Sequence, residues 1–362
     1  MQKKIYSKIL IGVLVILAVA ARIAIGIGAF QAYSGLLGSI LFPAFDPLPV
    51  TGSYHVLSET YTWIDKERLE TYETTGANRE VTIKIWYPKE EGNYPLVVFS
   101  HGAGGMLESN ESTCKELASN GYVAVAIAHP YQAAYVENTS GKVTIVSTEF
   151  MNQVLDNNGS SDPQHEKEVF EWSREWMKIR TGDVNFVLDT ILAKVKAGEK
   201  APFDRINPDK IGVFGHSLGG ATAVAIGRER KDISAVIDIE GTMLTEETGY
   251  ENGTYHYQEE PYPVPLLDIN SRVVYEQATE SDQQYVNFYV GEHAACFQAV
   301  IFEDAGHMNF CDLALASPSL AKILGVGTVD ARTCLENLNE IVLNDFNYYL
   351  KDAPSLDIRE VY

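Results

Sequence analysis

Short apolar runs recur along the chain from about residue 80 onward, with polar or mixed stretches between them. The first run, 81–87, alternates apolar and polar residues, which predicts a half-exposed strand at the edge of a sheet. The later runs are almost continuously apolar, as expected of parallel strands that are buried on both faces. They cover residues 95–99, 122–128, 211–214, 233–237, 264–267 and 297–302.

Longer segments with helical periodicity lie between these runs. We predict helices over residues 111–119, 166–196, 218–228 and 335–350. One stripe of the longest helix is interpreted as core packing; it consists of Val169, Trp172, Trp176, Ile179 and Phe186, with Phe170, Met177, Val184 and Ile191 beside it. Alternating strands and helices indicate the α/β class, with a mostly parallel central sheet and helices on both faces. The polar stretch 131–163 is interpreted as an excursion above the sheet, either a lid or an exposed loop.

The first 45 residues differ from the rest. Three lysines precede an apolar run over residues 9–21, and a second largely apolar stretch follows Arg22. A membrane span needs ~20 apolar residues, and residues 9–30 supply them if Arg22 is tolerated. The motif Ala18-Val19-Ala20 is typical of a signal-peptide cleavage site. We therefore expect an uncleaved membrane anchor with the body outside the cytoplasm, or a secreted protein if the segment is cleaved.

Three prolines, Pro43, Pro47 and Pro49, mark a linker after this segment. We accordingly divide the chain into an N-terminal apolar membrane segment, residues 1–45, and a globular body, residues 46–362. The body is long enough to bury a sizeable core.

Charge separates the two parts as well. The first 45 residues contain four basic residues and no acidic one, so the body is even more acidic than the formal net charge of -21 indicates. Such a body repels a phosphate backbone, which argues against a nucleic-acid partner.

No two of the four cysteines form a CxxC pair, which argues against a zinc or redox motif. Cys311 and Cys334 could pair in an exported protein.

One five-residue motif carries the first chemical signal. Residues 215–219 read Gly-His-Ser-Leu-Gly and match G-x-S-x-G. A predicted strand enters this motif and a predicted helix of small residues leaves it, which is the context that lifts a serine Oγ above the sheet in α/β-hydrolases. The sequence therefore predicts an α/β-hydrolase fold with Ser217 as nucleophile. The alternative is a glycine-rich turn with an incidental serine.

A second motif supports the first. Residues 100–105 read Ser-His-Gly-Ala-Gly-Gly and follow the apolar strand 95–99 directly. In this fold such a loop presents a backbone N–H to the developing oxyanion. We expect the N–H groups of Ala103 and Leu218 to form the oxyanion hole, because donors that are fixed in advance stabilise charge best.

The base is expected after the acid in chain order. His307 lies just past the last predicted strand, where a loop can carry it back over the serine. His293 is the alternative, but it precedes that strand. His101 and His216 belong to the two motifs and are badly placed for the role.

The acid is less well determined, since three carboxylates are available. Asp238 and Glu240 lie on the same side of the strand after the serine helix. Glu240 is at its tip, next to Gly241, whereas Asp238 lies deeper and would need buried partners. Asp268 lies early on the following strand. We favour Glu240, then Asp238, then Asp268.

Several motifs together resemble the platelet-activating factor acetylhydrolase family over roughly residues 50–350. They lie at residues 78–88, 180–189, 215–222, 238–243, 265–271 and 305–310. Matching Met243 to the methionine that follows the acid in that family places the acid at Glu240, where the family commonly has aspartate. This departure keeps Asp238 as an alternative.

The resemblance implies a Ser217–Glu240–His307 triad, with Ala103 and Leu218 as the oxyanion residues. It also implies hydrolysis of esters, often short or oxidised acyl chains on phospholipids, without a metal or another cofactor.

The expected function is therefore hydrolysis of carboxylic esters through an acyl-enzyme. The expected partners are a small-molecule or lipid ester and, through the N-terminal segment, a membrane. One alternative is a polyester or dienelactone-type hydrolase with the same triad. The other is a non-catalytic α/β-hydrolase scaffold that acts as a surface binding module.

Overall fold

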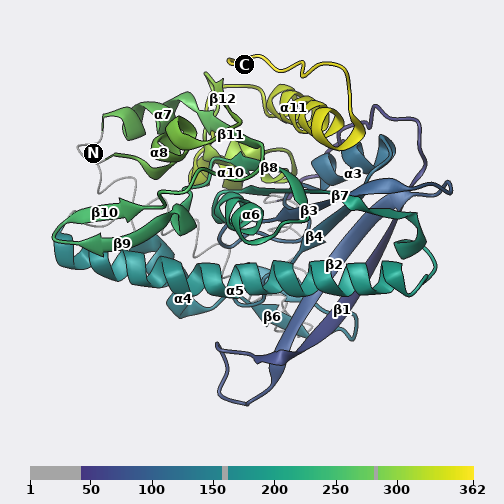
Figure 1. The fold of residues 1–362 in the computed structure, drawn as a ribbon, viewed down its shortest axis with the longest axis horizontal. Coiled ribbons are helices and arrows are strands. Elements are labelled where there is room, and N and C mark those ends of the chain that lie inside the picture. The colour runs from purple at the N-terminus through teal and green to yellow at the C-terminus, as the bar shows by residue number, and fades with distance from the viewer. Residues whose placement is uncertain (1–41, 157–161, 281–283) are drawn as a thin grey trace.

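The computed structural model describes residues 42–156, 162–280 and 284–362 (Figure 1). The predicted membrane segment falls on residues 1–41, outside the described residues. In the three described ranges, no helix combines the length and the hydropathy that a membrane crossing requires.

A central sheet organises the described chain. Its eight strands follow the order β1-β2-β4-β3-β7-β8-β11-β12. They are β1 (Val56–Leu69), β2 (Asn78–Pro88), β3 (Tyr94–Ser100), β4 (Val123–Ile127), β7 (Ile206–His216), β8 (Ile233–Ile239), β11 (Leu266–Ser271) and β12 (Phe297–Phe302). Strand β2 pairs antiparallel with β1 and β4, while every pair from β4 to β12 is parallel. The predicted mostly parallel sheet is confirmed.

The prediction of an edge strand over 81–87 is wrong. Strand β1, which the sequence analysis did not assign, pairs with β2 from end to end and forms the edge itself. The polar side chains of β2 find partners there and on the neighbouring helix. The Thr82 hydroxyl lies 3.0 Å from that of Thr62, and the Lys84 ammonium donates to Glu108 and Glu111 at 3.3 Å each. The alternation of apolar and polar residues in β2 therefore reflects polar side chains that have partners, not side chains exposed to solvent.

The strand predicted over 264–267 lies at 266–271 instead. It contains Asp268 and Asn270, which interrupt the apolar run although both side chains are buried. Buried polar residues need partners, and the Asn287 side chain donates to Asp268 at 3.4 Å.

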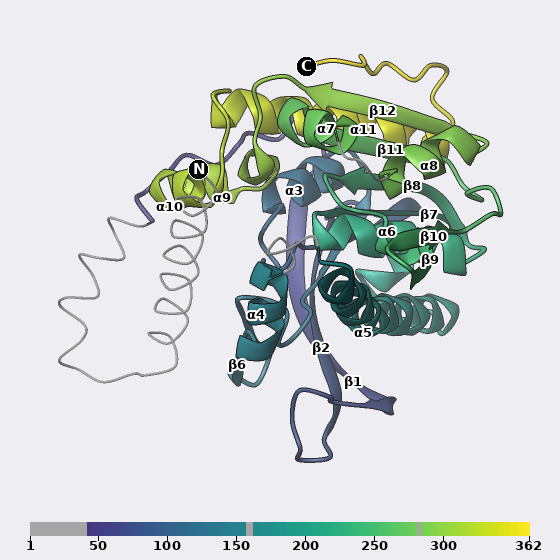
Figure 2. The same cartoon turned by 90° about the vertical axis from the view of Figure 1, so that its left-hand side faces the viewer.

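Helices cover both faces of the sheet, as predicted. Helices α3 (Glu111–Ser119) and α11 (Ala331–Lys351) pack on one face, against side chains such as Phe99. Helix α6 (Leu218–Glu229) and the long helix α5 (Pro163–Lys196) lie on the other, where Val98 points. Neighbouring residues of one strand point to opposite faces, so the buried strands feed two separate cores. Figure 2 shows α5 and α6 on one side of the molecule and α11 on the other.

The buried face of α5 matches the predicted core packing only in part. Met177, Val184 and Ile191, which lie beside the predicted stripe, are buried. Trp176 is buried, but Val169, Ile179 and Phe186 are only partly so. Arg180 and Asp183 are instead completely buried. A pattern that counts only apolar residues assigns charged positions to solvent, whereas here they face a buried polar network.

The described residues of the excursion over 131–163 include regular elements. These are β5 (Tyr135–Glu137), β6 (Val143–Ile145) and α4 (Thr148–Asp156), while residues 157–161 lie outside the described residues. Phe150 and Met151 of α4 belong to a buried apolar cluster with Trp176 and Leu218. The excursion therefore forms a packed wall beside the start of α6, and it is not an exposed loop.

The remaining elements connect these layers. They are β9 (Glu247–Glu251), β10 (Thr254–Tyr257), α7 (Arg272–Thr279), α8 (Val286–His293), α9 (Leu313–Ala316) and α10 (Pro318–Leu324), with single 3-10 turns at Phe203–Arg205, Leu244–Glu246 and His307–Phe310. All four cysteines are free thiols, so Cys311 and Cys334 are not paired.

Candidate active site

Ser217 occupies a strained turn between β7 and α6. Its φ of 58° and ψ of -127° lie where a non-glycine residue rarely sits. Such strain costs about 1–3 kcal/mol and persists where the surroundings enforce it. The motif glycines explain how the turn closes: a Cβ on Gly215 would lie 2.1 Å from the Gly219 carbonyl oxygen, and one on Gly219 would lie 1.9 Å from that of Ser100. The turn therefore places Ser217 at the carboxyl end of β7.

The predicted oxyanion loop lies against this turn. A Cβ on Gly102 would lie 3.1 Å from the Cβ of Ser217, and Ala103 packs against the apolar cluster that contains Leu218. Among the described residues, neither the Ala103 N–H nor the Leu218 N–H donates to a backbone carbonyl. Both predicted donors thus lie near Ser217, and Leu218 adds the positive end of helix α6.

Glu240 and His307 are brought together from separate loops. His307 Nδ1 lies 2.7 Å from Glu240 Oε2, and the second carboxylate oxygen accepts the Ser271 N–H at 2.7 Å. The Glu240 side chain is 1% exposed, whereas that of His307 is 38% exposed. A carboxylate only accepts hydrogen bonds, so His307 carries its proton on Nδ1 and leaves Nε2 free to accept one.

His216 connects the loop that carries His307 to the turn that carries Ser217. Its Nε2–H donates to the His307 carbonyl at 3.0 Å, and the two imidazole rings are 4.5 Å apart. Burial, together with the nearby His307, holds the pKa of His216 well below its usual range. His216 is therefore a neutral neighbour that ties His307 to the residue preceding Ser217.

The other predicted histidines are engaged elsewhere. His293 ends α8 and donates its Nδ1–H to the Tyr289 carbonyl of its own helix at 2.7 Å. His101 is completely buried and bonds to the Gly102 carbonyl at 2.7 Å.

Asp238 and Asp268 lie beneath Glu240, paired in register on neighbouring strands. Asp238 Oδ1 accepts the Gly241 N–H at 2.9 Å, so this residue supports the turn that carries Glu240. Burial raises the pKa of Asp238 well above its usual range and raises that of Asp268 to about 7. Of the three candidate acids, only Glu240 bonds to His307 in the described chain. The catalytic roles themselves stay predictions.

Asn309 shapes the loop that carries His307, and it was not among the predicted site residues. The side-chain oxygen of buried Asn309 accepts the N–H groups of Gly306 at 2.9 Å and Gly327 at 2.7 Å. Asn309 thereby ties the backbone before His307 to a segment 18 residues further on. The sequence did contain a signal for this role, because Asn309 lies two residues after His307 within the motif at 305–310.

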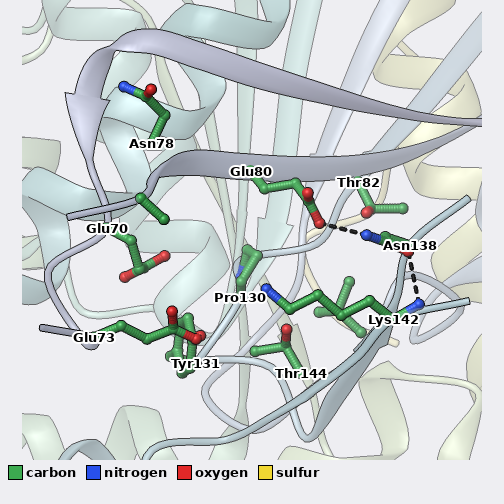
Figure 3. Close-up of a pocket in the computed structure, with 12 residues that line it drawn as sticks. Glu70, Glu73, Asn78, Glu80, Thr82, Pro130, Tyr131, Asn138, Lys142 and Thr144 are labelled. Carbon is green, nitrogen blue, oxygen red and sulfur yellow. Dashed lines mark hydrogen bonds between the residues drawn. The ribbon is translucent and has the colours of Figure 1, made fainter. Parts of the chain in front are cut away.

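A separate hollow opens beside β2 and the β5–β6 segment (Figure 3). Its carboxylates already have partners: Glu70 pairs with Arg79 at 2.6 Å, Glu80 accepts from Asn138 at 2.6 Å, and Glu73 accepts from the Tyr131 hydroxyl. None of the predicted site residues lines it.

Comparison with known proteins identifies a family and several relatives. The family model described as platelet-activating factor acetylhydrolase, isoform II, matches residues 62–354. The platelet-activating factor acetylhydrolase of Cavia porcellus is 25% identical over 277 residues, which cover 71% of this chain and 58% of the relative. That of Canis lupus familiaris is 24% identical over 263 residues, which cover 69% and 56%. The chain thus spans less than two thirds of the length of these relatives.

A solved structure has a similar fold. The ferulic acid esterase from Streptomyces cinnamoneus superimposes with a TM-score of 0.66 at 22% identity, covering 86% of this chain and 95% of the esterase. This likeness confirms an α/β-hydrolase-like architecture.

Proposed function

This chain belongs to the platelet-activating factor acetylhydrolase, isoform II, family, and on that premise we propose that it hydrolyses carboxylic esters as a serine hydrolase. The observation that carries the proposal is the 2.7 Å hydrogen bond between His307 and Glu240. It fixes an imidazole with a free Nε2 on a loop that His216 ties to the Ser217 turn. A hydroxyl becomes a good nucleophile only with such a base beside it.

The reaction proceeds through an acyl-enzyme. His307 Nε2 takes the hydroxyl proton as Ser217 Oγ bonds to the ester carbonyl carbon, and the carbonyl oxygen gains the negative charge. The N–H groups of Ala103 and Leu218 stabilise that charge. His307 then protonates the departing alcohol. Water, activated by His307, releases the acid and restores Ser217. Glu240 orients the imidazole and stabilises its protonated form.

Short acyl chains, such as acetyl, are the proposed acyl group, and a phospholipid-like alcohol is the proposed leaving group. The relatives are named for an acetyl ester. The apolar wall that includes Met151 and Phe150 supports a small apolar acyl chain, because it packs beside Leu218 and Ala103. Polar headgroups would remain on the solvent side, where His307 is exposed.

We also propose that the chain is attached to a membrane by its N-terminal segment, with the globular body outside the cytoplasm. This attachment is supported by the lysines and the long apolar stretch before residue 45. Protease treatment of intact cells should remove the body while leaving a short membrane-bound fragment. Recovery of the whole chain in the cytoplasmic fraction would contradict this attachment.

Turnover of a chromogenic acetate ester tests the proposed activity. Ser217→Ala should abolish turnover while the far-UV circular dichroism stays that of the wild type. Ser355→Ala is the control, because Ser355 is exposed near the end of the chain, and it should retain activity. A series of esters of increasing acyl length should show the highest kcat/KM at the short end. Equal turnover by Ser217→Ala and wild type would exclude the proposed nucleophile.

A further inference from the structure

Arg180, in the middle of α5, binds the loop that carries the proposed oxyanion donor. The residue is completely buried. Its Nη1 donates to the His101 carbonyl at 2.5 Å, and its Nη2 donates to the Gly102 carbonyl at 3.3 Å. Its Nε donates to the Gln132 side chain at 2.7 Å. The guanidinium thus contacts the two carbonyls that directly precede Ala103.

These contacts fix the orientation of one peptide group. The Gly102 carbonyl accepts a second hydrogen bond from His101 Nδ1 at 2.7 Å. The Gly102 C=O and the Ala103 N–H belong to the same planar trans peptide, in which they point in opposite directions. The Gly105 N–H is a third donor to this carbonyl, at 3.0 Å. Because these three donors hold the carbonyl, with Arg180 as the one that comes from α5, the Ala103 N–H points to the opposite side of the peptide. Ser217 packs against Gly102 at this point.

A buried hydrogen-bond chain sets the direction of these donors. The carboxylate of Asp183 accepts from His129 Nδ1 at 3.0 Å, so His129 Nε2 accepts the Ser100 hydroxyl at 2.9 Å. Burial lowers the pKa of His129 to about 4, so the ring is neutral at neutral pH. The oxygen of Ser100 in turn accepts from Arg180 Nη1 at 3.4 Å.

The same chain decides the tautomer of His101. The backbone N–H of His129 donates to His101 Nε2 at 3.3 Å. His101 must then carry its proton on Nδ1, the atom that donates to the Gly102 carbonyl.

The network keeps the guanidinium charged although it is buried. Burial lowers the pKa of Arg180 to about 9, so it remains cationic at neutral pH. The negative charge of Asp183 acts in the other direction and raises the pKa of Arg180, although the ion pairs of Asp183 are with Arg79 at 2.8 Å and Arg68 at 2.9 Å. Glu70 balances Arg79 at 2.6 Å. A buried cation of this kind is stable only with such partners.

We propose that Arg180 is a positioning residue that aims the Ala103 N–H at the oxyanion. The inference rests on the proposed function, because an oxyanion forms only if Ser217 attacks an ester. A group that improves only the binding of the transition state changes kcat and leaves KM nearly constant. Nothing in this role requires Arg180 to touch the substrate.

The test compares Arg180→Met and Arg180→Lys with the control Arg228→Met. Arg228 pairs with buried Glu246 at the other end of α6, so its loss also breaks a buried ion pair. Lysine keeps the charge but cannot bridge two carbonyls as a guanidinium does. Thermal unfolding of each variant measures the lost stability.

Kinetics and a transition-state analogue supply the first readout. Arg180→Met should lower kcat about 100-fold, the scale of one lost oxyanion donor, with KM within about twofold. The inhibition constant of a trifluoromethyl ketone, which forms a tetrahedral adduct with an active-site serine, should rise by the same factor as kcat falls. Arg180→Lys should lie between Arg180→Met and the wild type, and Arg228→Met should match the wild type.

An equal fall of kcat in Arg180→Met and Arg228→Met, with no change in the inhibition constant, would overturn the proposal. So would full kcat in a folded Arg180→Met. If Arg180→Met does not fold, Arg180→Lys decides the matter: a kcat and an inhibition constant equal to those of the wild type would overturn the proposal.

A spectroscopic readout separates this proposal from the proposed function. In protein labelled with ¹⁵N-alanine, the Ala103 amide resonance should shift in Arg180→Met and stay in place in Arg228→Met. Absent turnover by the wild type would contradict the proposed function alone, while the resonance still reports the peptide orientation. An unmoved Ala103 resonance in folded Arg180→Met would overturn the positioning role.

Discussion

Three carboxylic acids lie close together on β8, just after it and on β11, and their surroundings differ. Glu240 accepts hydrogen bonds from His307 and from the Ser271 backbone. Asp238 is enclosed by backbone, since a Cβ on Gly220 would lie 1.8 Å from its Oδ1. Burial raises the pKa of Asp238 well above the usual range. The position of Glu240 in the chain favoured it as the acid, and of the two residues it is Glu240 that contacts His307.

Paired substitutions test this division at the scale of single residues. Glu240→Gln should lower kcat about 10³- to 10⁴-fold, because an amide no longer holds His307 in the required tautomer. Asp238→Asn should leave kcat within about threefold, since asparagine has the shape of aspartate and its side-chain oxygen can still accept the Gly241 N–H. Steady-state kinetics on an acetate ester measure both. A larger loss in Asp238→Asn than in Glu240→Gln would assign the acid role to Asp238.

Sequence reasoning placed Ser217, His307 and Glu240 through motifs and chain order, and it could not place the residues that hold them. Asn309 and Arg180 act on backbone groups that are distant in sequence or on another element. Nothing in a local pattern indicates which carbonyl a side chain will reach. Such partners become visible only when the fold brings the segments together.

At the scale of elements, the start of α6 and the loop after β3 are packed as one unit. The close contact is at Gly219, where a Cβ would lie 1.9 Å from the Ser100 carbonyl oxygen and 2.7 Å from that of His101. The turn that carries Ser217 and the loop over residues 100–105 therefore cannot move independently.

Gly219→Ala should disturb both parts at once. Overpacking of this kind costs about 1–3 kcal/mol in unfolding free energy, and displacement by about 1 Å near reacting groups can lower kcat about 100-fold. Gly249→Ala on β9 is the control, because its Cβ would lie an ordinary 3.5 Å from the His256 ring. Urea unfolding and ester kinetics measure the two effects. Wild-type kcat in Gly219→Ala would show that the two segments are not coupled in this way.

The apolar runs predicted most of the sheet, whereas β1 and the β9–β10 hairpin were missed. The sequence of β1 carries five charged residues, and only Asp65 among its fourteen positions is buried. An edge strand with little buried surface has no hydrophobic pattern by which to recognise it. Its pairing with β2 is set by the backbone instead.

At the scale of the whole molecule, buried acids make stability depend on pH. Asp345 of α11 is 2% exposed, and burial raises its pKa to about 8. In the unfolded chain an aspartate has a pKa of about 3.9. The folded state therefore binds the extra proton between these values, and the stability from this group is lost as pH rises from about 4 to about 8.

Asp345→Asn removes this titration without changing the size of the side chain. The slope of unfolding free energy against pH should become more positive by about 1.4 kcal/mol per pH unit between pH 5 and 7. Urea unfolding at pH 5, 6 and 7 gives the slope, with the exposed Asp357→Asn as control. Identical slopes for Asp345→Asn and wild type would mean that Asp345 is ionised in the folded protein.

The central claim for the whole molecule is an activated serine at position 217, and it separates a hydrolase from a non-catalytic scaffold. Fluorophosphonates react with serines that have a base and an oxyanion hole. The most direct measurement is labelling with such a probe, followed by mass spectrometry of the digested protein. We predict one adduct, on Ser217, that forms in step with loss of esterase activity and is absent in Ser217→Ala. A folded protein that takes up no probe, or takes it up at another serine, would contradict the account.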